Sequence, residues 1–140
     1  MCSSLSAQRL VLIVEDDPEI QELLQLVLAD EQIPAAHART ARAALSALAE
    51  SRPTVMLLDL GLPDAAATPI ASVLAAAREA GTRVIICSAA GRSVDELSSR
   101  TEGDAYLVKP FDIDDLLSVI RRLLDESQRL PAQEHRQRQA

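Results

Sequence analysis

The sequence predicts an α/β domain: a doubly wound parallel sheet of five strands with helices on both faces. Strand-length apolar runs alternate along the chain with segments whose apolar residues recur at helical spacing. The apolar runs do not alternate with polar residues, which is typical of strands that are buried on both faces of a parallel sheet. At 140 residues, the chain has the length of one domain.

The first strand and the first helix are expected within residues 9–30. Residues 9–14 (RLVLIV) are a run of leucine and β-branched residues of strand length. Asp17 then suits the N-cap of a helix, and Pro18 suits its first position. Apolar residues follow at helical spacing, namely Ile20, Leu23, Leu24, Val27 and Leu28.

The second strand and the second helix are expected within residues 34–50. Residues 34–38 (PAAHA) are a weak strand candidate because they hold few β-branched residues. Thr40 can cap a helix that runs through Glu50. Its inner face would consist of Ala41, Ala44, Leu45 and Leu48.

The middle of the chain predicts two strands with a helix between them. Residues 54–59 (TVMLLD) and 83–88 (RVIICS) have the composition of buried strands. Thr68 and Pro69 resemble a cap followed by a first helical residue, and the alanine-rich helix should stop near Gly81.

The last third of the chain predicts a short strand before the clearest helix. Residues 94–99 are weakly helical, and residues 105–110 (AYLVKP) form the fifth expected strand. Asp112 can cap the last helix. The apolar stripe of that helix comprises Ile113, Leu116, Leu117, Ile120, Leu123 and Leu124.

These elements divide the chain into three parts. We expect an N-terminal tail over residues 1–7, one domain over residues 8–127, and a polar C-terminal tail or linker over residues 128–140. The tails are polar and lack an apolar pattern. The strand order expected for such a sheet is 2-1-3-4-5, as in flavodoxin-like folds, in which ligands bind beyond the carboxyl ends of the strands.

The composition argues against several classes of function. With a net charge of −7 and one Tyr, one Phe and no Trp, the chain offers neither a basic surface nor aromatic stacking for direct nucleic-acid binding. Cys2 and Cys87 do not make a disulfide framework, which fits a reducing compartment. No apolar run approaches the roughly 20 residues of a membrane span, and the first residues lack a signal-peptide core. We therefore expect a cytoplasmic domain without membrane contact.

Charged and polar residues follow four of the five strands. They are Glu15, Asp16, Asp59, Ser88 and Lys109. Carboxyl ends of parallel strands meet at one edge, so these side chains should converge. Acids in such proximity repel one another unless a cation lies among them, and oxygen ligands suit Mg²⁺. An aspartate placed beside such an ion can act as the nucleophile in phosphoryl transfer, so Asp59 is the expected phosphoacceptor.

At these strand ends, the chain resembles a receiver domain of a two-component response regulator. Four segments carry the resemblance in order, which covers about residues 9–127: LIVEDD, LLDLGLP, IICSAA and YLVKPF. The resemblance implies that Asp59 accepts the phosphoryl group. It implies that Asp16 and the Gly61 carbonyl bind Mg²⁺ together with Asp59, that Glu15 helps through water, and that Mn²⁺ is an alternative ion.

The resemblance also implies roles for three further residues. Ser88 would be the switch hydroxyl, Lys109 the cation that senses the phosphoryl group, and Tyr106 the aromatic switch. The bond between Lys109 and Pro110 is expected to be cis. The output face would comprise the helix near residues 94–99, the fifth strand and the last helix.

The partners that the resemblance implies are proteins. The phosphoryl donor would be a phosphohistidine on a sensor histidine kinase or a histidine phosphotransfer protein. The output would reach a downstream effector domain or protein, and the family allows a phosphorylation-dependent homodimer. The chain would not be an enzyme on external substrates, because it would catalyse only its own phosphoryl transfer and dephosphorylation. Small residues at Gly61 and Ala90 would leave water access to the phosphorylated site.

Two departures from the family pattern are visible. The residues after Asp64 are AAAT, where the family usually has a glycine-containing turn, so this loop should be stiffer or differently shaped. The segment between Ser88 and Tyr106 is one residue shorter than is common.

Three other functions remain as alternatives. A pseudo-receiver would bind a partner without being phosphorylated, but the acidic set, Ser88 and Lys109 are all present. A phosphatase of the haloacid-dehalogenase type would need an aspartate where this chain has Gly61. A nucleotide-binding enzyme lacks its glycine-rich motifs here. The chain could act alone, as an intermediate in a phosphorelay, or as part of a longer protein.

Overall fold

The five expected strands form one parallel sheet. The structure, a computed structural model, describes the backbone of residues 9–88 and 103–139, and the side chains of residues 9–88 and 103–126. The strands lie in the order β2-β1-β3-β4-β5, which confirms the predicted topology. Their bounds are β1 Val11–Val14, β2 Ala35–Ala38, β3 Val55–Asp59, β4 Arg83–Ser88 and β5 Ala105–Val108.

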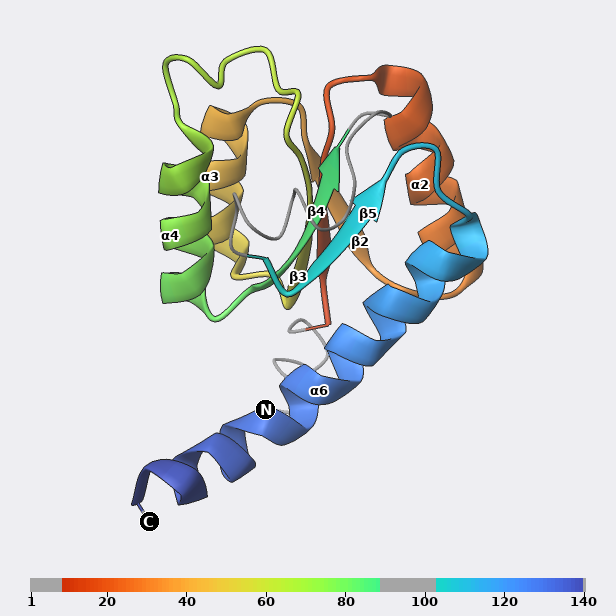
Figure 1. Cartoon of the computed structure of the whole chain (residues 1–140). Coiled ribbons are helices and arrows are strands. Elements are labelled where there is room, and N and C mark those ends of the chain that lie inside the picture. The colour runs from red at the N-terminus through yellow and green to blue at the C-terminus, as the bar shows by residue number, and fades with distance from the viewer. Residues whose placement is uncertain (1–8, 89–102, 140) are drawn as a thin grey trace.

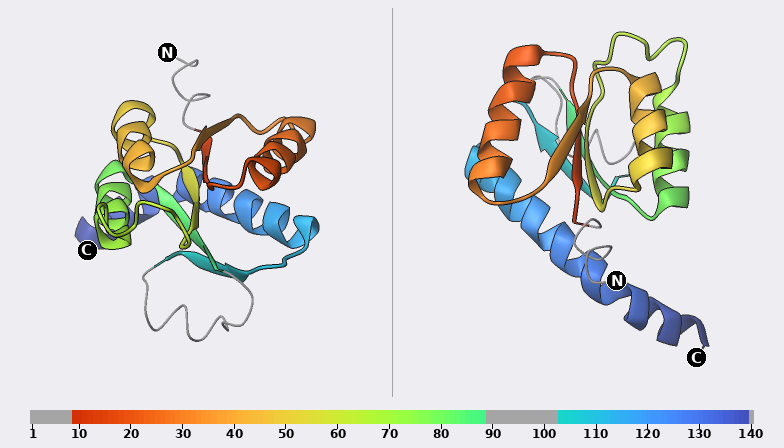
Figure 2. Two further views of the ribbon diagram at one scale, coloured as in Figure 1. Left: turned by 90° about the horizontal axis from the view of Figure 1, so that it is seen from above. Right: turned by 180° about the vertical axis from the view of Figure 1, so that it is seen from behind.

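Helices cover both faces of this sheet. Their bounds are α2 Pro18–Asp30, α3 Ala41–Ser51, α4 Ile70–Ala80 and α6 Ile113–Gln139. Figures 1 and 2 show α3 and α4 on one face and α2 and α6 on the other. The helix expected near residues 94–99 and the predicted tail over residues 1–7 lie outside the described residues.

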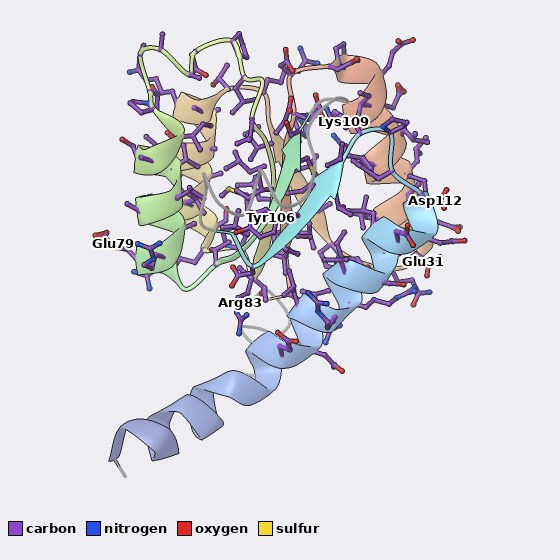
Figure 3. All side chains as sticks on the ribbon, viewed as in Figure 1. Glu31, Glu79, Arg83, Tyr106, Lys109 and Asp112 are labelled. Carbon is purple, nitrogen blue, oxygen red and sulfur yellow. The ribbon has the colours of Figure 1, made fainter. Side chains whose placement is uncertain are left out.

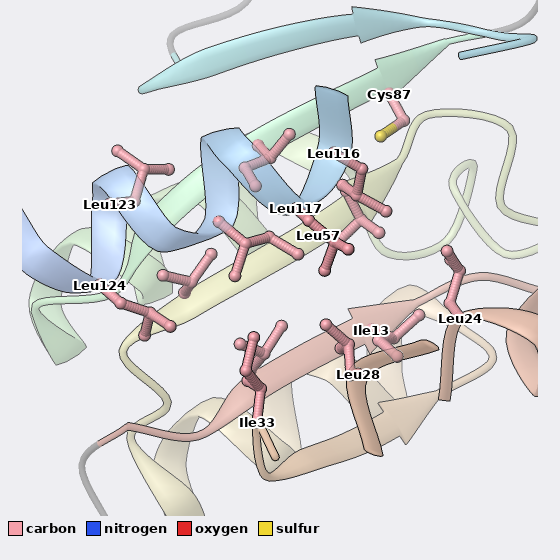
Figure 4. Close-up of a cluster of buried hydrophobic side chains, with 14 residues drawn as sticks. Ile13, Leu24, Leu28, Ile33, Leu57, Cys87, Leu116, Leu117, Leu123 and Leu124 are labelled. Carbon is pink, nitrogen blue, oxygen red and sulfur yellow. The ribbon is translucent and has the colours of Figure 1, made fainter. Parts of the chain in front are cut away.

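Each face of the sheet has its own hydrophobic core. On one face, side chains of α2 and α6 pack against strand residues such as Ile13, Leu57 and Ile85 (Figure 4). On the other face, small residues of α3 and α4 pack against Leu12, Met56 and other strand residues. Strands β1, β3 and β4 are therefore buried on both faces, as the lack of polar alternation predicted.

The helix caps follow the sequence at α2 and α3 and differ at α4. The carboxylate of Asp17 accepts the amides of Glu19 and Ile20, with Pro18 at the first helical position. Thr40 caps α3 through the amide of Ala43. Both predictions are confirmed.

The prediction that Thr68 caps the next helix and that Pro69 is its first residue was wrong. Helix α4 begins at Ile70, and Pro69 is its N-cap, with extended backbone and no side-chain cap. The physical reason is the preceding turn, in which the amide of Thr68 donates to the carbonyl of Asp64 at 2.8 Å. The same helix ends at Gly81 in a left-handed conformation, as predicted.

Helix α6 continues well past its apolar stripe. It begins directly after Asp112, whose carbonyl accepts the amide of Leu116, and it runs to Gln139, past the sheet (Figure 1). From the sequence, only a polar tail or linker is expected beyond residue 127. That segment lacks an apolar pattern, but its glutamine, arginine and alanine residues have good intrinsic helix propensity. Among the described residues, no helix is long and apolar enough to span a membrane.

Candidate functional site

Three carboxylates meet at the carboxyl edge of the sheet. Glu15 and Asp16 directly follow β1, and Asp59 is the last residue of β3. Strands β1 and β3 are direct neighbours with Val14 opposite Leu58, so Glu15 and Asp59 end side by side. One carboxylate oxygen from each of the three acids lies within 4.8 Å of the others. The convergence that the strand ends predicted is confirmed for these residues.

Lys109 supplies a positive charge to this cluster. It follows β5, and Figure 3 shows it at the carboxyl end of that strand. Its Nζ lies 2.9 Å from Oε1 of Glu15 and 3.6 Å from Oδ1 of Asp59. The bond between Lys109 and Pro110 is cis, as predicted.

Burial and charge together shift the pKa values of this pair. Burial raises the pKa of Glu15, and the charge of Asp59 acts in the same direction, while the hydrogen bond from Lys109 lowers it. The net direction is upward. For Lys109, burial alone would lower the pKa, but the hydrogen bond to Glu15 and the charges of Asp59 and Glu15 outweigh it. The pKa of Lys109 is therefore raised, and the ammonium stays charged.

Asp59 is almost completely buried at the edge of the sheet. Its side chain is 9% exposed. The amide of Gly61 donates to its Oδ1 at 3.2 Å, so the residues after β3 fold back toward the carboxylate. Gly61 itself is exposed. The carboxylate of Asp59 therefore lies just below the surface of this edge, beside the exposed residue Gly61.

The donor set fits a hard divalent cation. Carboxylate oxygens of Glu15, Asp16 and Asp59 lie close enough to share one ion, and Asp16 is exposed, which leaves room for water ligands. Oxygen ligands with retained water are typical of Mg²⁺ in proteins. The described cluster therefore has the chemistry that a magnesium ion would need.

Ser88 and Tyr106 take different positions relative to this cluster. Ser88 is the buried last residue of β4, next to Cys87, the register partner of Asp59. Its carbonyl accepts the amide of Lys109 at 2.8 Å, so it lies at the same edge. Tyr106 lies earlier on its strand (Figure 3) and packs against the core formed with α3 and α4. Its hydroxyl accepts the amide of Gly103 at 2.8 Å.

Two polar residues that were not predicted from the sequence, Gln21 and Asp64, also support this site. Gln21 is 3% exposed, and its Nε2 donates to the carbonyls of Glu15 and Ala38 at 3.2 and 3.4 Å. The only sequence signal for Gln21 was a polar residue on the inner face of a helix.

Asp64 is the second supporting residue. Its carboxylate accepts the amide of Ala41 at 2.8 Å and the amide of Arg42 at 3.0 Å. These hydrogen bonds lower the pKa of Asp64. No local spacing could indicate this contact, because its partners lie in another element of the chain.

The sequence of this chain matches a known protein family over most of its length. The sequence model described as the response regulator receiver domain matches residues 11–121. This chain belongs to the response regulator receiver domain family. The match agrees with the extent and identity of the resemblance seen in the four motifs.

Two relatives of this receiver domain are longer regulatory proteins. It is 33% identical over 124 residues to the DNA-binding response regulator MtrA of Mycolicibacterium smegmatis, covering 88% of this chain and 54% of MtrA. It is 36% identical over 113 residues to the transcriptional regulatory protein KdpE of Mycobacterium tuberculosis, covering 80% of this chain and 49% of KdpE. The chain thus spans about half the length of these relatives.

A solved structure supports the same fold. A CheY-like response regulator receiver domain protein from Methanospirillum hungatei superimposes with a TM-score of 0.74 at 28% sequence identity. The alignment covers 86% of this chain and 97% of that protein. The receiver fold therefore accounts for most of the chain.

Proposed function

We propose that this receiver domain is a phosphorylation switch in which Asp59 accepts a phosphoryl group from a partner phosphohistidine. The observation that carries the proposal is the cluster at the sheet edge. Oxygens of Glu15, Asp16 and Asp59 lie within 4.8 Å of one another, and Nζ of Lys109 lies 3.6 Å from Asp59. A carboxylate in this setting can act as a nucleophile toward phosphorus.

The chemistry assigns one task to each residue. A carboxylate oxygen of Asp59 forms the new bond to phosphorus, and the bond from phosphorus to the histidine nitrogen breaks, with its electron pair leaving on the nitrogen. Lys109 offsets negative charge on the phosphoryl oxygens, and the hydroxyl of Ser88 donates a hydrogen bond to one of them. Glu15, Asp16, Asp59 and the Gly61 carbonyl would hold Mg²⁺, with Mn²⁺ as an alternative. When bound, this ion supplies charge neutralisation for the transferring group.

Loss of the signal and its transmission are further parts of this proposal. Water reaches the acyl phosphate beside Gly61, which is exposed, so the domain catalyses its own dephosphorylation. Tyr106 and Ser88 then report the phosphorylation state to the output face. The shorter segment before Tyr106 lies mostly outside the described residues.

The partners are proposed from the family and from the relatives. A sensor histidine kinase or a histidine phosphotransfer protein supplies the phosphoryl group in the cytoplasm. The output passes to an effector domain or protein, or to a phosphorylation-dependent homodimer. MtrA is named a DNA-binding regulator, and this chain covers about half of it. The expectation of no direct nucleic-acid contact therefore concerns only these 140 residues, whose net charge is −7.

Intact-mass measurement tests the proposal. Wild type and Asp59→Asn are incubated with Mg²⁺ and acetyl phosphate, and the expected result is one phosphoryl group on wild type and none on the variant. Chelation of the metal should prevent the modification of wild type. If folded wild type remained unmodified with both acetyl phosphate and a phosphorylated histidine kinase, the pseudo-receiver function would replace the proposed one.

A further inference from the structure

The carboxylate of Asp64 joins two elements that carry different parts of the site. Its Oδ1 accepts the amide of Ala41 at 2.8 Å, and its Oδ2 accepts the amide of Arg42 at 3.0 Å. These are the first two amides of α3, which have no partner within the helix itself. Both oxygens of one carboxylate are therefore used in a single contact at the positive end of the helix.

Asp64 also organises the loop that follows the proposed phosphoacceptor. Its backbone carbonyl accepts the amides of Ala67 at 3.1 Å and Thr68 at 2.8 Å. The same loop contains Gly61, whose amide contacts Asp59 and whose carbonyl is the proposed metal ligand. Side chain and backbone of Asp64 thus hold this loop against α3.

The segment that ends in Glu15 is hydrogen-bonded to a residue shortly before the start of α3. The amide of Glu15 donates to the carbonyl of Ala38 at 3.0 Å, three residues before α3 begins at Ala41. Gln21 bridges the carbonyls of Glu15 and Ala38 from its buried position on α2. Glu15 is thus bound to the last residue of β2, and the loop after Asp59 is bound through Asp64 to the first residues of α3, which follow β2 closely in the chain.

We propose that Asp64 is a positioning residue for the metal site. By fixing the loop after Asp59 to the N-terminus of α3, it sets the distance between the Gly61 carbonyl and the carboxylates of Glu15 and Asp16. This inference rests on the proposed function. Residues that orient metal ligands from outside the ligand set typically change metal affinity by about 10- to 100-fold when they are replaced.

Asp64→Ala is the informative variant, and Thr40→Ala is its matched control. Thr40 caps the same helix through Ala43 at 3.0 Å and has no described contact with the loop after Asp59. Both variants remove a cap from α3, so a purely structural effect would be common to them. Magnesium affinity is measured by calorimetry in the full chain, and unfolding by urea is measured without metal.

We expect Asp64→Ala to weaken Mg²⁺ binding by about tenfold or more, while Thr40→Ala binds as wild type does. Asp64→Asn, which keeps one acceptor oxygen for one amide, should fall between wild type and Asp64→Ala. With acetyl phosphate, Asp64→Ala should need correspondingly more Mg²⁺ for half-maximal phosphorylation but reach the wild-type extent at saturation.

Three outcomes would overturn the inference. The first is wild-type Mg²⁺ affinity in folded Asp64→Ala, and the second is an equal loss of affinity in Thr40→Ala. If Asp64→Ala does not fold, the comparison of Asp64→Asn with Thr40→Ala decides in the same way. The third is wild-type protein that binds no Mg²⁺, which would overturn the proposed metal site as well. Wild-type binding with unchanged variants would remove only the role of Asp64.

Discussion

At the scale of single residues, Gly103 lies where the backbone passes close to the core. A Cβ atom at this position would lie 2.5 Å from Cγ1 of Ile86, a side chain that is fully buried. The amide of Gly103 also donates to the hydroxyl of Tyr106, the proposed switch. Alanine at position 103 would therefore force the core and the strand that carries Tyr106 apart.

We expect Gly103→Ala to lower the free energy of unfolding by about 1–3 kcal/mol, the usual cost of overpacking a core. Equilibrium unfolding in urea measures the difference. Gly61→Ala is the matched control, because its Cβ would lie 3.8 Å from the Asp59 carboxylate, which is an ordinary contact. Equal stability of Gly103→Ala and wild type would contradict the close approach.

The buried thiol of Cys87 makes the free energy of unfolding depend on pH in the alkaline range. Burial raises the pKa of its thiol from 9.0 to about 12, and the charges of Asp59 and Glu15 act in the same direction against that of Lys109. The folded chain therefore keeps the thiol proton that the unfolded chain loses above about pH 9. This contribution to stability is complete below that pH and is lost as the pH rises toward about 12.

We expect wild type to lose roughly 1 kcal/mol more stability than Cys87→Ala between about pH 8 and about pH 10. Urea unfolding in the presence of a chelator at the two pH values measures this difference. The variant itself should be less stable at both values because it leaves a cavity. Parallel losses in the two proteins would show that the thiol ionises equally in both states.

At the scale of elements, helix α6 has one part that packs on the sheet and one part that runs past it (Figure 1). Within residues 113–126, whose side chains the structure describes, the buried ones are Leu116, Leu117, Ile120, Leu123 and Leu124. Arg121 also forms an ion pair with Glu31, which ties this part of the helix to the end of α2. The backbone helix continues to Gln139, beyond the segment that the sequence pattern predicted.

We expect a chain that ends at Ser127 to unfold at the same urea concentration as the full chain and to be phosphorylated to the same extent. The reason is that the buried stripe described for α6 ends at Leu124. A chain that ends at Ile120 lacks two buried leucines, each worth about 2–5 kcal/mol by comparison with alanine substitutions, and should be much less stable. A clear loss of stability in the chain that ends at Ser127 would move the domain boundary past residue 127.

At the scale of the whole molecule, the sheet brings charges that are distant in the sequence together at one edge. The two cores bury the strands, and Glu15, Asp59 and Ser88 are buried polar residues at the carboxyl ends of β1, β3 and β4. Lys109 offsets part of the negative charge of Glu15 and Asp59. The remaining negative charge is the feature that the proposed divalent cation would neutralise.

The sequence by itself determined the fold class and the edge at which the acids meet, and the expected strand order followed from the flavodoxin-like fold class. Strand and helix periods are local properties, and parallel strands must place their carboxyl ends together. Glu15, Asp59 and Lys109 could therefore be predicted from their places after apolar runs. The caps at Asp17 and Thr40 were also predictable, because an N-cap acts on amides two or three residues away.

Only the tertiary structure decided which distant groups contact one another. The contact of Asp64 with α3, the bridge from Gln21 and the approach of Gly103 to Ile86 depend on how whole elements pack. The start of α4 after Pro69 depended on a turn closed by hydrogen bonds to Asp64. Such contacts are set by the distances between packed layers, and neither the period nor the composition of a segment encodes those distances.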